Sequence, residues 1–338
     1  MECFLSDDEP HEDSAAQIDV VLYRDLSGVP CRFFLFPMQK HWSYDVGSIG
    51  IGATALFSGA DWWEGGLPVP KPPSGHGRPL LLPVTEERAQ LVARWEHELR
   101  RAGWKIVTSL EDTIVELGSK DGLRRRAERL GLLAHLPRFY CSKSAASYPC
   151  IAKPTNGVAG RWVQLLQTEH EATQHERHYA DTGAQYGQLI FQEWVPGHKE
   201  YATSMVLRDG HIFAACTVEY KYDRQDYTWP KCQEVERRFL GTATASSHLR
   251  ILQAFLADYT GICNANYKLT HDGRLRILEF NPRIGGDLGT DAPRDQAREM
   301  LLAMESLAST RVNEGTSSAR GGYSRGTSGT TTYESKGE

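Results

Sequence analysis

The chain has 338 residues, of which 40% are hydrophobic and 24% are charged, and its formal net charge is -5. This length allows two or three domains with a buried core and excludes a small disulfide-stapled scaffold. The charge balance gives no reason to expect nucleic acid or an anionic membrane as a partner. No apolar run approaches the roughly 18 to 20 residues that cross a bilayer, and the first residues are acidic, unlike a signal peptide. The cysteines are scattered without a C-x-x-C pair, so we expect a cytoplasmic protein with reduced thiols and no membrane partner.

The first half of the chain predicts an N-terminal α/β domain over residues 17–115, preceded by a disordered acidic leader at 1–16. The segments "DVVLYR", "CRFFLF" and "WKIVTS" are typical of strands, and "TEERAQLVARWEHELRRAG" has the apolar period of a helix with a threonine cap and a terminal glycine. The glycine-rich "GIGATA" at 50–55 superficially matches a dinucleotide fingerprint. It follows no convincing strand, so we interpret it as a loop.

The remainder predicts an α+β domain over residues 116–308, and the Gly-, Ser- and Thr-rich segment 309–338 predicts a disordered tail. The helix in "SKDGLRRRAERLGL" has an apolar stripe of Leu123, Ala127 and Leu130, and its arginines are interpreted as a solvated surface. "PCIAKP" is a short buried strand, "TNGVAGR" a glycine loop and "EHEATQHERHYADTG" a helix. The long alternating stretch around Arg208-Asp209-Gly210 indicates a hairpin.

A second hairpin is predicted in "NANYKLTHDGRLRILEF", with Asp272-Gly273 as a two-residue turn. If that turn forms, Asn266 lies opposite Glu279 and Asn264 lies opposite Asn281. The hairpin register alone would then assemble a polar cluster.

The strand that ends in "ILEFNPRIGG" places Glu279, Asn281 and Arg283 on one face, because residues two apart in a strand share a face. A carboxylate and carboxamides are hard oxygen ligands that suit Mg²⁺. An arginine beside them can hold a phosphoryl or carboxylate group through two hydrogen bonds. The open alternative is a surface ion pair between Glu279 and Arg283, followed by an ordinary turn.

Four blocks in order, "SK" at 119–120, "PCIAKP" with "TNGVAG", "QEWVPGHKEY" and "NANY" with "ILEFNPRIGG", resemble motifs of the ATP-grasp superfamily. Within it they are similar to the nucleotide domains of carbamoyl-phosphate synthetase and biotin carboxylase. The resemblance covers residues 116 to 290, roughly half of the chain. It implies an ATP-grasp fold with an N-terminal α/β (pre-ATP-grasp) domain, a nucleotide lid subdomain at about 140–200 and a metal and acceptor subdomain at about 201–308.

The resemblance also implies site residues and the cofactors ATP and Mg²⁺, with Mn²⁺ as an alternative ion. Its expected ATP-binding residues are Lys120, Lys153, Gly157, Gly160, Gln192, Glu193, Trp194, Val195 and Glu200. Its expected metal ligands are Asn266, Glu279 and Asn281, its substrate residues are Arg283, Gly285 and Gly286, and its catalytic residues are Lys153 and Arg283. The sequence departs from the family at Asn266, where relatives carry a glutamine or an acid, which leaves one firm carboxylate in the cluster.

The reaction that the resemblance implies is an ATP-dependent ligation, in which a carboxylate becomes an acyl phosphate and is attacked by an amine. The expected partners are a small-molecule carboxylate, that of an amino acid or similar small acid, and an amine. A homodimer is compatible with related folds. The alternatives are a carboxylase or carbamate-forming enzyme that uses bicarbonate, and a nucleotide-binding regulator without turnover. The segment 219–239 is expected to cover the substrate, with Lys221, Arg237 or Arg238 contacting a carboxylate.

Overall fold

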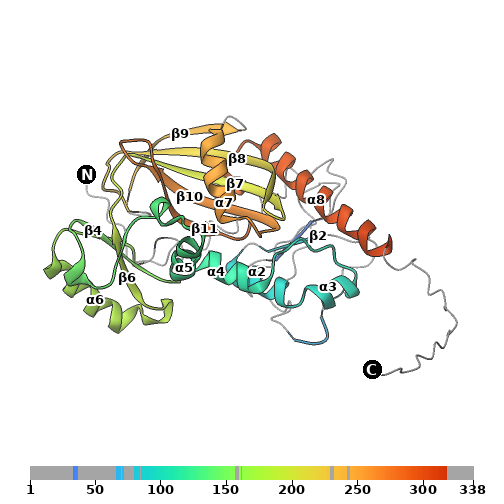
Figure 1. Ribbon diagram of the computed structural model, residues 1–338, viewed down its shortest axis with the longest axis horizontal. Helices are drawn as coiled ribbons and strands as arrows, with labels where there is room; N and C mark the ends of the chain where they lie inside the picture. Colours follow the sequence, from blue (N-terminus) through green and yellow to red (C-terminus); the bar gives the residue numbers. More distant parts are fainter. Residues whose placement is uncertain are drawn as a thin grey trace, which may run out of the picture.

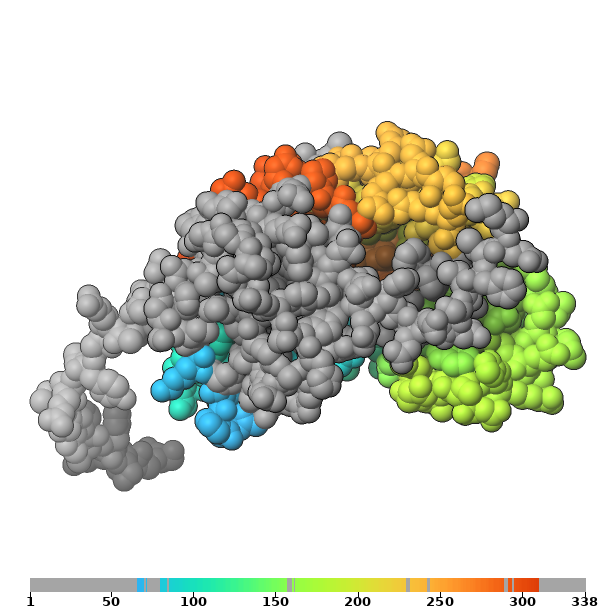
Figure 2. Space-filling view, turned by 180° about the vertical axis from the view of Figure 1, so that it is seen from behind, coloured from blue at the N-terminus to red at the C-terminus, as the bar shows by residue number. Residues whose placement is uncertain are grey.

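The computed structural model describes residues 33–36, 66–69, 71, 80–83, 85–156, 160, 162–228, 232–241 and 244–317. These residues form a five-stranded sheet in the order β11-β10-β7-β8-β9, a four-stranded sheet in the order β3-β6-β4-β5, and a strand pair β1-β2. Figure 1 shows the four-stranded sheet and α6 in green at the lower left, below the yellow and orange five-stranded sheet, with α8 in red at the far end. Figure 2 shows the same two lobes from behind, where they lie one above the other.

The five-stranded sheet, which we call the central sheet, carries the second half of the chain. Its strands are β7 (Lys199–Arg208), β8 (His211–Tyr222), β9 (Glu234–Gly241), β10 (Gly261–Leu269) and β11 (Leu275–Asn281). All neighbouring strands are antiparallel. The predicted hairpin at Arg208-Asp209-Gly210 is confirmed, and Asp209 and Gly210 both have positive φ, as a tight two-residue hairpin turn requires.

Helices cover both faces of the central sheet, which explains the almost unbroken burial of β7. On one face, α7 (Ser246–Phe255) packs Leu252 and Phe255 against Met205 and Tyr267. On the other, α8 (Arg294–Ser317) packs its apolar side chains against strand residues that include Val206. Helix α8 covers only part of that second face, and the remainder holds the polar residues described below.

The four-stranded sheet, which we call the lid sheet, contains β3 (Phe139–Tyr140), β4 (Cys150–Pro154), β5 (Gln164–Leu166) and β6 (Leu189–Glu193). Helix α6 (Glu169–Thr182) begins at the Thr168 cap and buries Ala172 against the sheet. Short 3₁₀ turns lie at Leu133–His135, Lys143–Ala145 and Ala184–Tyr186. The strand predicted in "PCIAKP" and the helix predicted in "EHEATQHERHYADTG" are confirmed.

In the N-terminal region, β1 (Phe33–Phe36) pairs in parallel with β2 (Leu80–Pro83), which confirms the strand predicted in "CRFFLF". The predicted long helix forms as two, α2 (Glu86–Arg94) and α3 (Glu96–Ala102), separated at Trp95, with Thr85 as the cap and Gly103 as the left-handed terminus. The strand predicted in "WKIVTS" is wrong, because only an isolated bridge between Leu80 and Lys105 forms there. "DVVLYR" and residues 50–55 lie outside the described residues.

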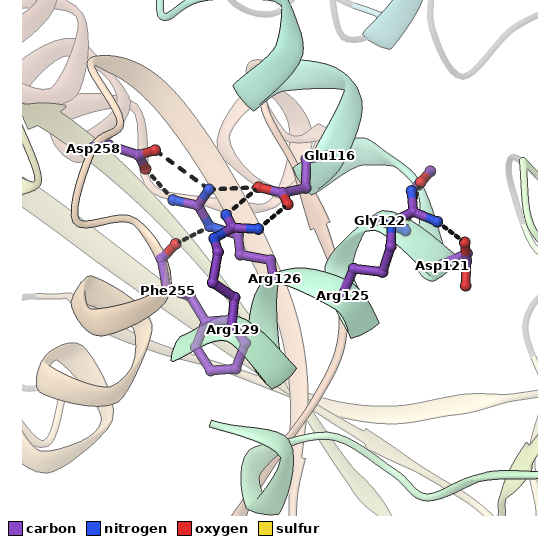
Figure 3. A network of polar contacts seen from close by, with 9 residues as sticks. Glu116, Asp121, Gly122, Arg125, Arg126, Arg129, Phe255 and Asp258 are labelled. Atoms are coloured by element: carbon purple, nitrogen blue, oxygen red, sulfur yellow. Dashed lines mark hydrogen bonds and ion pairs between the residues drawn. The ribbon is translucent and has the colours of Figure 1, made fainter. Parts of the chain in front are cut away.

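Helices α4 (Glu111–Gly118) and α5 (Lys120–Leu130) connect this region to the lid sheet. The interpretation of the α5 arginines as a solvated surface is wrong for Arg126, whose side chain is 2% exposed. Its guanidinium donates to the Phe255 carbonyl at 2.6 Å and to Glu116 at 2.7 Å, and it also pairs with Asp258 (Figure 3). Arg126 therefore connects α5 to the end of α7. The predicted apolar stripe of α5 is shorter than expected, because Leu130 is 40% exposed.

The second hairpin forms with the predicted pairs but not with the predicted turn. Thr270 and Arg274 close the turn through the Thr270 N–H and the Arg274 carbonyl, so it takes up His271, Asp272 and Gly273. The register then shifts between Asn266 and Tyr267, where β11 has Leu278 as an extra, bulged residue. The longer turn and the bulge offset each other, so Asn266 lies opposite Glu279 although the two-residue turn is wrong.

At the C-terminal end, the structure differs from the predicted boundary of the disordered tail. A short π-helix occupies Asp287–Asp291 directly after the "NPRIGG" turn. Helix α8 then continues to Ser317, past residue 308 at which the tail was predicted to begin.

Candidate functional site

The part of the central sheet that α8 leaves uncovered carries a row of polar side chains from β10 and β11. Asn264 pairs with Asn281 and Asn266 with Glu279 across the two strands, as the sequence predicts. The Asn281 amide donates to Asn264 Oδ1 at 3.0 Å, and the Asn266 amide donates to Glu200 Oε1 at 3.3 Å. The predicted metal ligands therefore lie together on one face.

Two lysines from other elements meet this row. Lys120, in the first turn of α5, places its Nζ 3.7 Å from Glu279 Oε2. Lys153, on β4 of the lid sheet, donates to the carbonyl of Leu278 at 3.3 Å, which is the carbonyl that the β11 bulge turns out of the strand pairing. Lys153 thus contacts the residue that directly precedes Glu279 in the chain.

Lys153 is buried, and its ammonium has no carboxylate within ion-pair distance among the described residues. The pKa of Lys153 is lowered to about 7, mainly by burial and then by the nearby Lys120, while Glu279 and Glu200 act in the opposite direction. A buried ammonium in such surroundings is stabilised by an added anion. This is the electrostatic setting that a nucleotide phosphate requires.

Glu200 lies on β7, and both of its carboxylate oxygens have hydrogen-bond donors. The Tyr227 hydroxyl donates to Oε2 at 2.7 Å and Asn266 donates to Oε1. Burial raises the pKa of Glu200, and the two hydrogen bonds and Lys268 act against this shift. Lys268, also buried, has its pKa lowered to about 8 by burial.

Arg283 lies at the end of the site nearest the N-terminal region. It donates to Asn281 Oδ1 at 3.3 Å and to its neighbouring Ile284 carbonyl at 2.8 Å, and it forms an ion pair of 3.1 Å with Glu86 of α2. Its buried Nε has no hydrogen-bond partner among the described residues. Within that part of the chain, the guanidinium has one unused donor where the sequence predicts contact with the acceptor.

Behind Arg283, Asp287 is buried and accepts from Asn264 at 2.8 Å and from Ser204 at 3.0 Å. Burial raises the pKa of Asp287 to about 6. A side chain at Gly285 would come within 2.8 Å of the Asn264 amide and closer still to Asp287 Oδ1. The absence of a Cβ at Gly285 is therefore required by this packing, in addition to any contact with a substrate.

The segment 219–239 was expected to be a covering loop, but most of it forms the end of β8 and the edge strand β9. Tyr220 pairs with Glu200 on one side and with Arg237 on the other, so Arg237 lies on the site face. Arg237 stacks on the Tyr220 ring at 5.3 Å and pairs with Asp291. Lys221 and Arg238 lie on the opposite face, because strand residues alternate, and the expectation for these two is wrong.

Two of the predicted ATP-binding residues form hydrogen bonds at the edge of the lid sheet. Gln192 donates to the Pro137 carbonyl at 3.3 Å, and Glu193 accepts from the Arg138 N–H at 2.9 Å, so both hold β3 against β6. Trp194 is partly buried and Val195 is buried. Gly160 has positive φ in the loop after β4, and Gly157 lies outside the described residues.

Several residues of the site were not predicted, although the sequence contains signals for some of them. Lys268 lies two residues after Asn266, so the alternation that groups Asn264 and Asn266 also includes it. Asp287 lies within the quoted "NPRIGGDLGTD" segment. Tyr227 lies in the segment 219–239 that was expected to cover the substrate, although it was not singled out. Glu86 reaches the site only through tertiary packing, for which no local pattern exists.

The donor set fits a divalent ion bound together with phosphates better than a metal held by protein alone. Among the described residues, no group of three or more His, Cys, Asp or Glu side chains could hold a metal ion. Glu279, Asn281 and Asn266 offer one carboxylate and two amide oxygens, and Mg²⁺ commonly binds a few protein oxygens and completes its shell with water and phosphate. The lysines beside them are suited to those phosphates.

No protein-family model matches the chain, and a search of curated proteins finds no relative. Solved structures do resemble it. An L-amino acid ligase from Bacillus licheniformis is 14% identical with a TM-score of 0.53, covering 81% of this chain and 74% of that one. The VanG D-Ala:D-Ser ligase from Enterococcus faecalis is 11% identical with a TM-score of 0.50, covering 69% and 72%.

A biotin carboxylase from Campylobacter jejuni is 13% identical with a TM-score of 0.48, covering 66% of this chain and 54% of that one. The chain thus spans about half the length of this carboxylase. The two ligase structures show that the chain has the ATP-grasp fold, which confirms the fold that the sequence motifs predict. Among the described residues, no helix has the length and apolar character needed to cross a membrane.

Proposed function

We propose, from the ATP-grasp fold and the cluster on its central sheet, that this chain is an ATP-dependent ligase. It activates a carboxylate, that of an amino acid or a similar small acid, as an acyl phosphate, which an amine then attacks. The observation that carries the proposal is the meeting of Lys120 and Lys153 with Glu279, Asn281 and Asn266. These residues come from three separate elements, and together they match the needs of phosphoryl transfer.

In this proposal the lysines bind and align the phosphates. Lys153 reaches the nucleotide from the lid sheet and Lys120 from the start of α5. Glu279, Asn281 and Asn266 hold Mg²⁺, or Mn²⁺, which when bound neutralises phosphate charge. Arg283 faces the acceptor, where it orients the carboxylate and the developing acyl phosphate. Glu200 accepts from the ribose hydroxyls, and Gly285 and Gly286 border the substrate.

The lid sheet supplies a way to exclude water, which would otherwise hydrolyse an acyl phosphate. Its β4 strand carries Lys153, so the sheet and the central sheet share the nucleotide. We also propose that the end of β6 and the linker after it contact adenine, through Gln192, Glu193, Trp194 and Val195. In the described structure the side chains of Gln192 and Glu193 stabilise the lid sheet itself.

The experiment is a measurement of ADP and phosphate release with a panel of amino acids and amines in the presence of ATP and Mg²⁺. Turnover that requires both an acid and an amine supports the ligase. Turnover that depends on bicarbonate replaces it with a carboxylase or carbamate-forming enzyme. Tight ATP binding without release under any pairing replaces it with a nucleotide-binding regulator. A thermal-shift screen narrows the panel, because a ligand that binds only the folded state raises the melting temperature.

A further inference from the structure

Lys268 is a buried lysine that forms no ion pair among the described residues; burial lowers its pKa, and the neighbouring Glu200 acts in the opposite direction. Its residue is 5% exposed, and among the described residues its side chain has no hydrogen-bond or ion-pair partner. Its Nζ lies over the ring of Tyr227, 4.4 Å from the ring centroid. Contact with an aromatic face compensates only part of the desolvation of an ammonium.

The position of Lys268 follows from the strand register. Tyr267 of β10 pairs with Tyr201 of β7, so the next residue, Lys268, lies across from Glu200 on the site face. It is two residues beyond Asn266 and four beyond Asn264, or about 7 and 14 Å along the strand. Lys268 therefore lies beyond the metal row, on the side away from Asn281 and Arg283.

The surroundings of Lys268 suit a flat, partly polar group. The ring of Tyr227 lies beside its ammonium, the centroid of the Tyr222 ring lies 3.9 Å from that of Tyr227, and Glu200 is the neighbouring carboxylate. If the phosphates lie at Lys120, Lys153 and Glu279, the base and ribose of the same nucleotide extend toward Glu200. An ammonium donor distinguishes bases by the acceptor atoms that they present.

We propose that Lys268 is a specificity-determining residue of the nucleotide site, which donates a hydrogen bond from its buried ammonium to a ring nitrogen or carbonyl oxygen of the nucleobase. This inference rests on the proposed function, since it places the base of the ATP-grasp nucleotide. It also explains why a lysine occupies a buried strand position that an aliphatic side chain would fill at lower cost. The ligand supplies a hydrogen-bond acceptor that the described residues do not offer.

The test is Lys268→Met, which keeps the length of the side chain and removes its charge and donors. The matched control is Lys221→Met on the opposite face of the same sheet, where the side chain is 45% exposed. Dissociation constants of ATP, GTP, CTP and UTP are measured by calorimetry with Mg²⁺, and the melting temperature is measured without nucleotide. The assay needs no turnover, so it is independent of the identity of the acid and amine.

We expect the wild type to favour one base by tenfold or more. Lys268→Met weakens the binding of that nucleotide by about tenfold to a hundredfold, as expected for the loss of a hydrogen bond from a charged group. It weakens the binding of the other nucleotides much less. The free variant melts at the same or a higher temperature, because it removes a buried ammonium that has no ion pair among the described residues. Lys221→Met changes neither property.

Two results would overturn the inference while leaving the proposed function intact. One is an unchanged order and spread of the four dissociation constants in Lys268→Met. The other is a lower melting temperature with an equal loss of affinity for all four nucleotides, which assigns Lys268 a structural role. A wild-type chain that binds none of the four nucleotides instead overturns the proposed function.

Discussion

Lys120 Nζ lies 3.7 Å from Glu279 Oε2, although the two residues belong to the first turn of α5 and to the hairpin strand β11. This ion pair joins the element that precedes the lid sheet to the strand that carries the proposed metal ligands. Glu279 remains 39% exposed, so its carboxylate is open to exchange its lysine partner for a divalent ion. Lys120 would then be available to a phosphate.

Glu279→Ala should lower turnover by about a hundredfold or more, because it removes the firm carboxylate that would hold the ion. The fold should change little, since a partly exposed ion pair contributes about 1 kcal/mol or less. Turnover is measured as ADP release under saturating Mg²⁺, and folding is measured by thermal denaturation.

The matched control for this variant is Glu236→Ala, which also removes a carboxylate paired with a lysine on the same sheet. Glu236 pairs with Lys221 on the face that lacks the row, so turnover should be unaffected. If Glu279→Ala kept near-full activity, Glu279 would have no role as a metal ligand.

The hairpin illustrates how far local sequence patterns determine the site. Alternation correctly placed Glu279 and Asn281 on one face, because a strand has a strict period of two. The turn type was wrong, and the pairing was still right because the bulge at Leu278 offset the longer turn. Neither the bulge nor its carbonyl contact with Lys153 leaves a signal in the alternating pattern.

Long-range contacts were the least predictable part of the site. Glu86 precedes Arg283 by almost two hundred residues, and only folding of the N-terminal region brings them together. Arg126 looked like one of several surface arginines, because the helix period cannot reveal that α7 and Asp258 lie against that side of α5. The lid residues Gln192 and Glu193 were assigned by motif, whereas their side chains bond within the lid sheet.

A double-mutant cycle on Arg283 and Glu86 should separate the structural role of the arginine from its proposed catalytic role. Arg283→Met leaves the largely buried Glu86 without its cation. We therefore expect the free energy of unfolding to fall by about 1 to 3 kcal/mol, and turnover to be lost. Adding Glu86→Gln should restore most of the stability and none of the turnover. Urea denaturation and ADP release are measured on all four proteins.

The cycle would contradict the role of Arg283 at the acceptor if the double variant recovered turnover together with stability. In that case the arginine would act only by holding α2 against the end of β11. Arg274→Met is a suitable control, since Arg274 lies in the turn before the same strand, where its exposed side chain pairs with Asp272 away from the row.

Gly285→Ala should damage the site through sterics alone. The added methyl group would lie within 2.8 Å of the Asn264 amide and press on Asp287, two residues that hydrogen-bond beneath Arg283. Overpacking of this kind costs about 1 to 3 kcal/mol, and the displaced Asn264 should also disturb Asn281. We expect a lower melting temperature and weaker turnover.

Gly118→Ala provides the comparison for Gly285→Ala. Its added methyl group would lie 3.5 Å from the Glu86 side chain and 3.7 Å from Pro282, which are ordinary contact distances. The melting temperature should therefore change little. Equal effects of the two substitutions would show that Gly285 is not constrained by Asn264 and Asp287.

Acid should destabilise the protein through Glu116, which bridges two arginines of α5. Hydrogen bonds from Arg129, and then from Arg126, lower the pKa of Glu116 from 4.5 to about 2, and burial acts against them. Because the folded-state pKa is below the unfolded one, the stabilisation is fully present above about pH 4.5 and is lost as the pH falls toward 2.

Glu116→Gln should therefore reduce the free energy of unfolding at pH 7 by roughly 1 to 3 kcal/mol, and the difference from wild type should shrink steadily between pH 4.5 and 2. Urea denaturation across this range checks the prediction, with Glu128→Gln on the exposed side of the same helix as the control. A constant difference between Glu116→Gln and wild type over the whole range would show that the charge of Glu116 does not link α5 to stability.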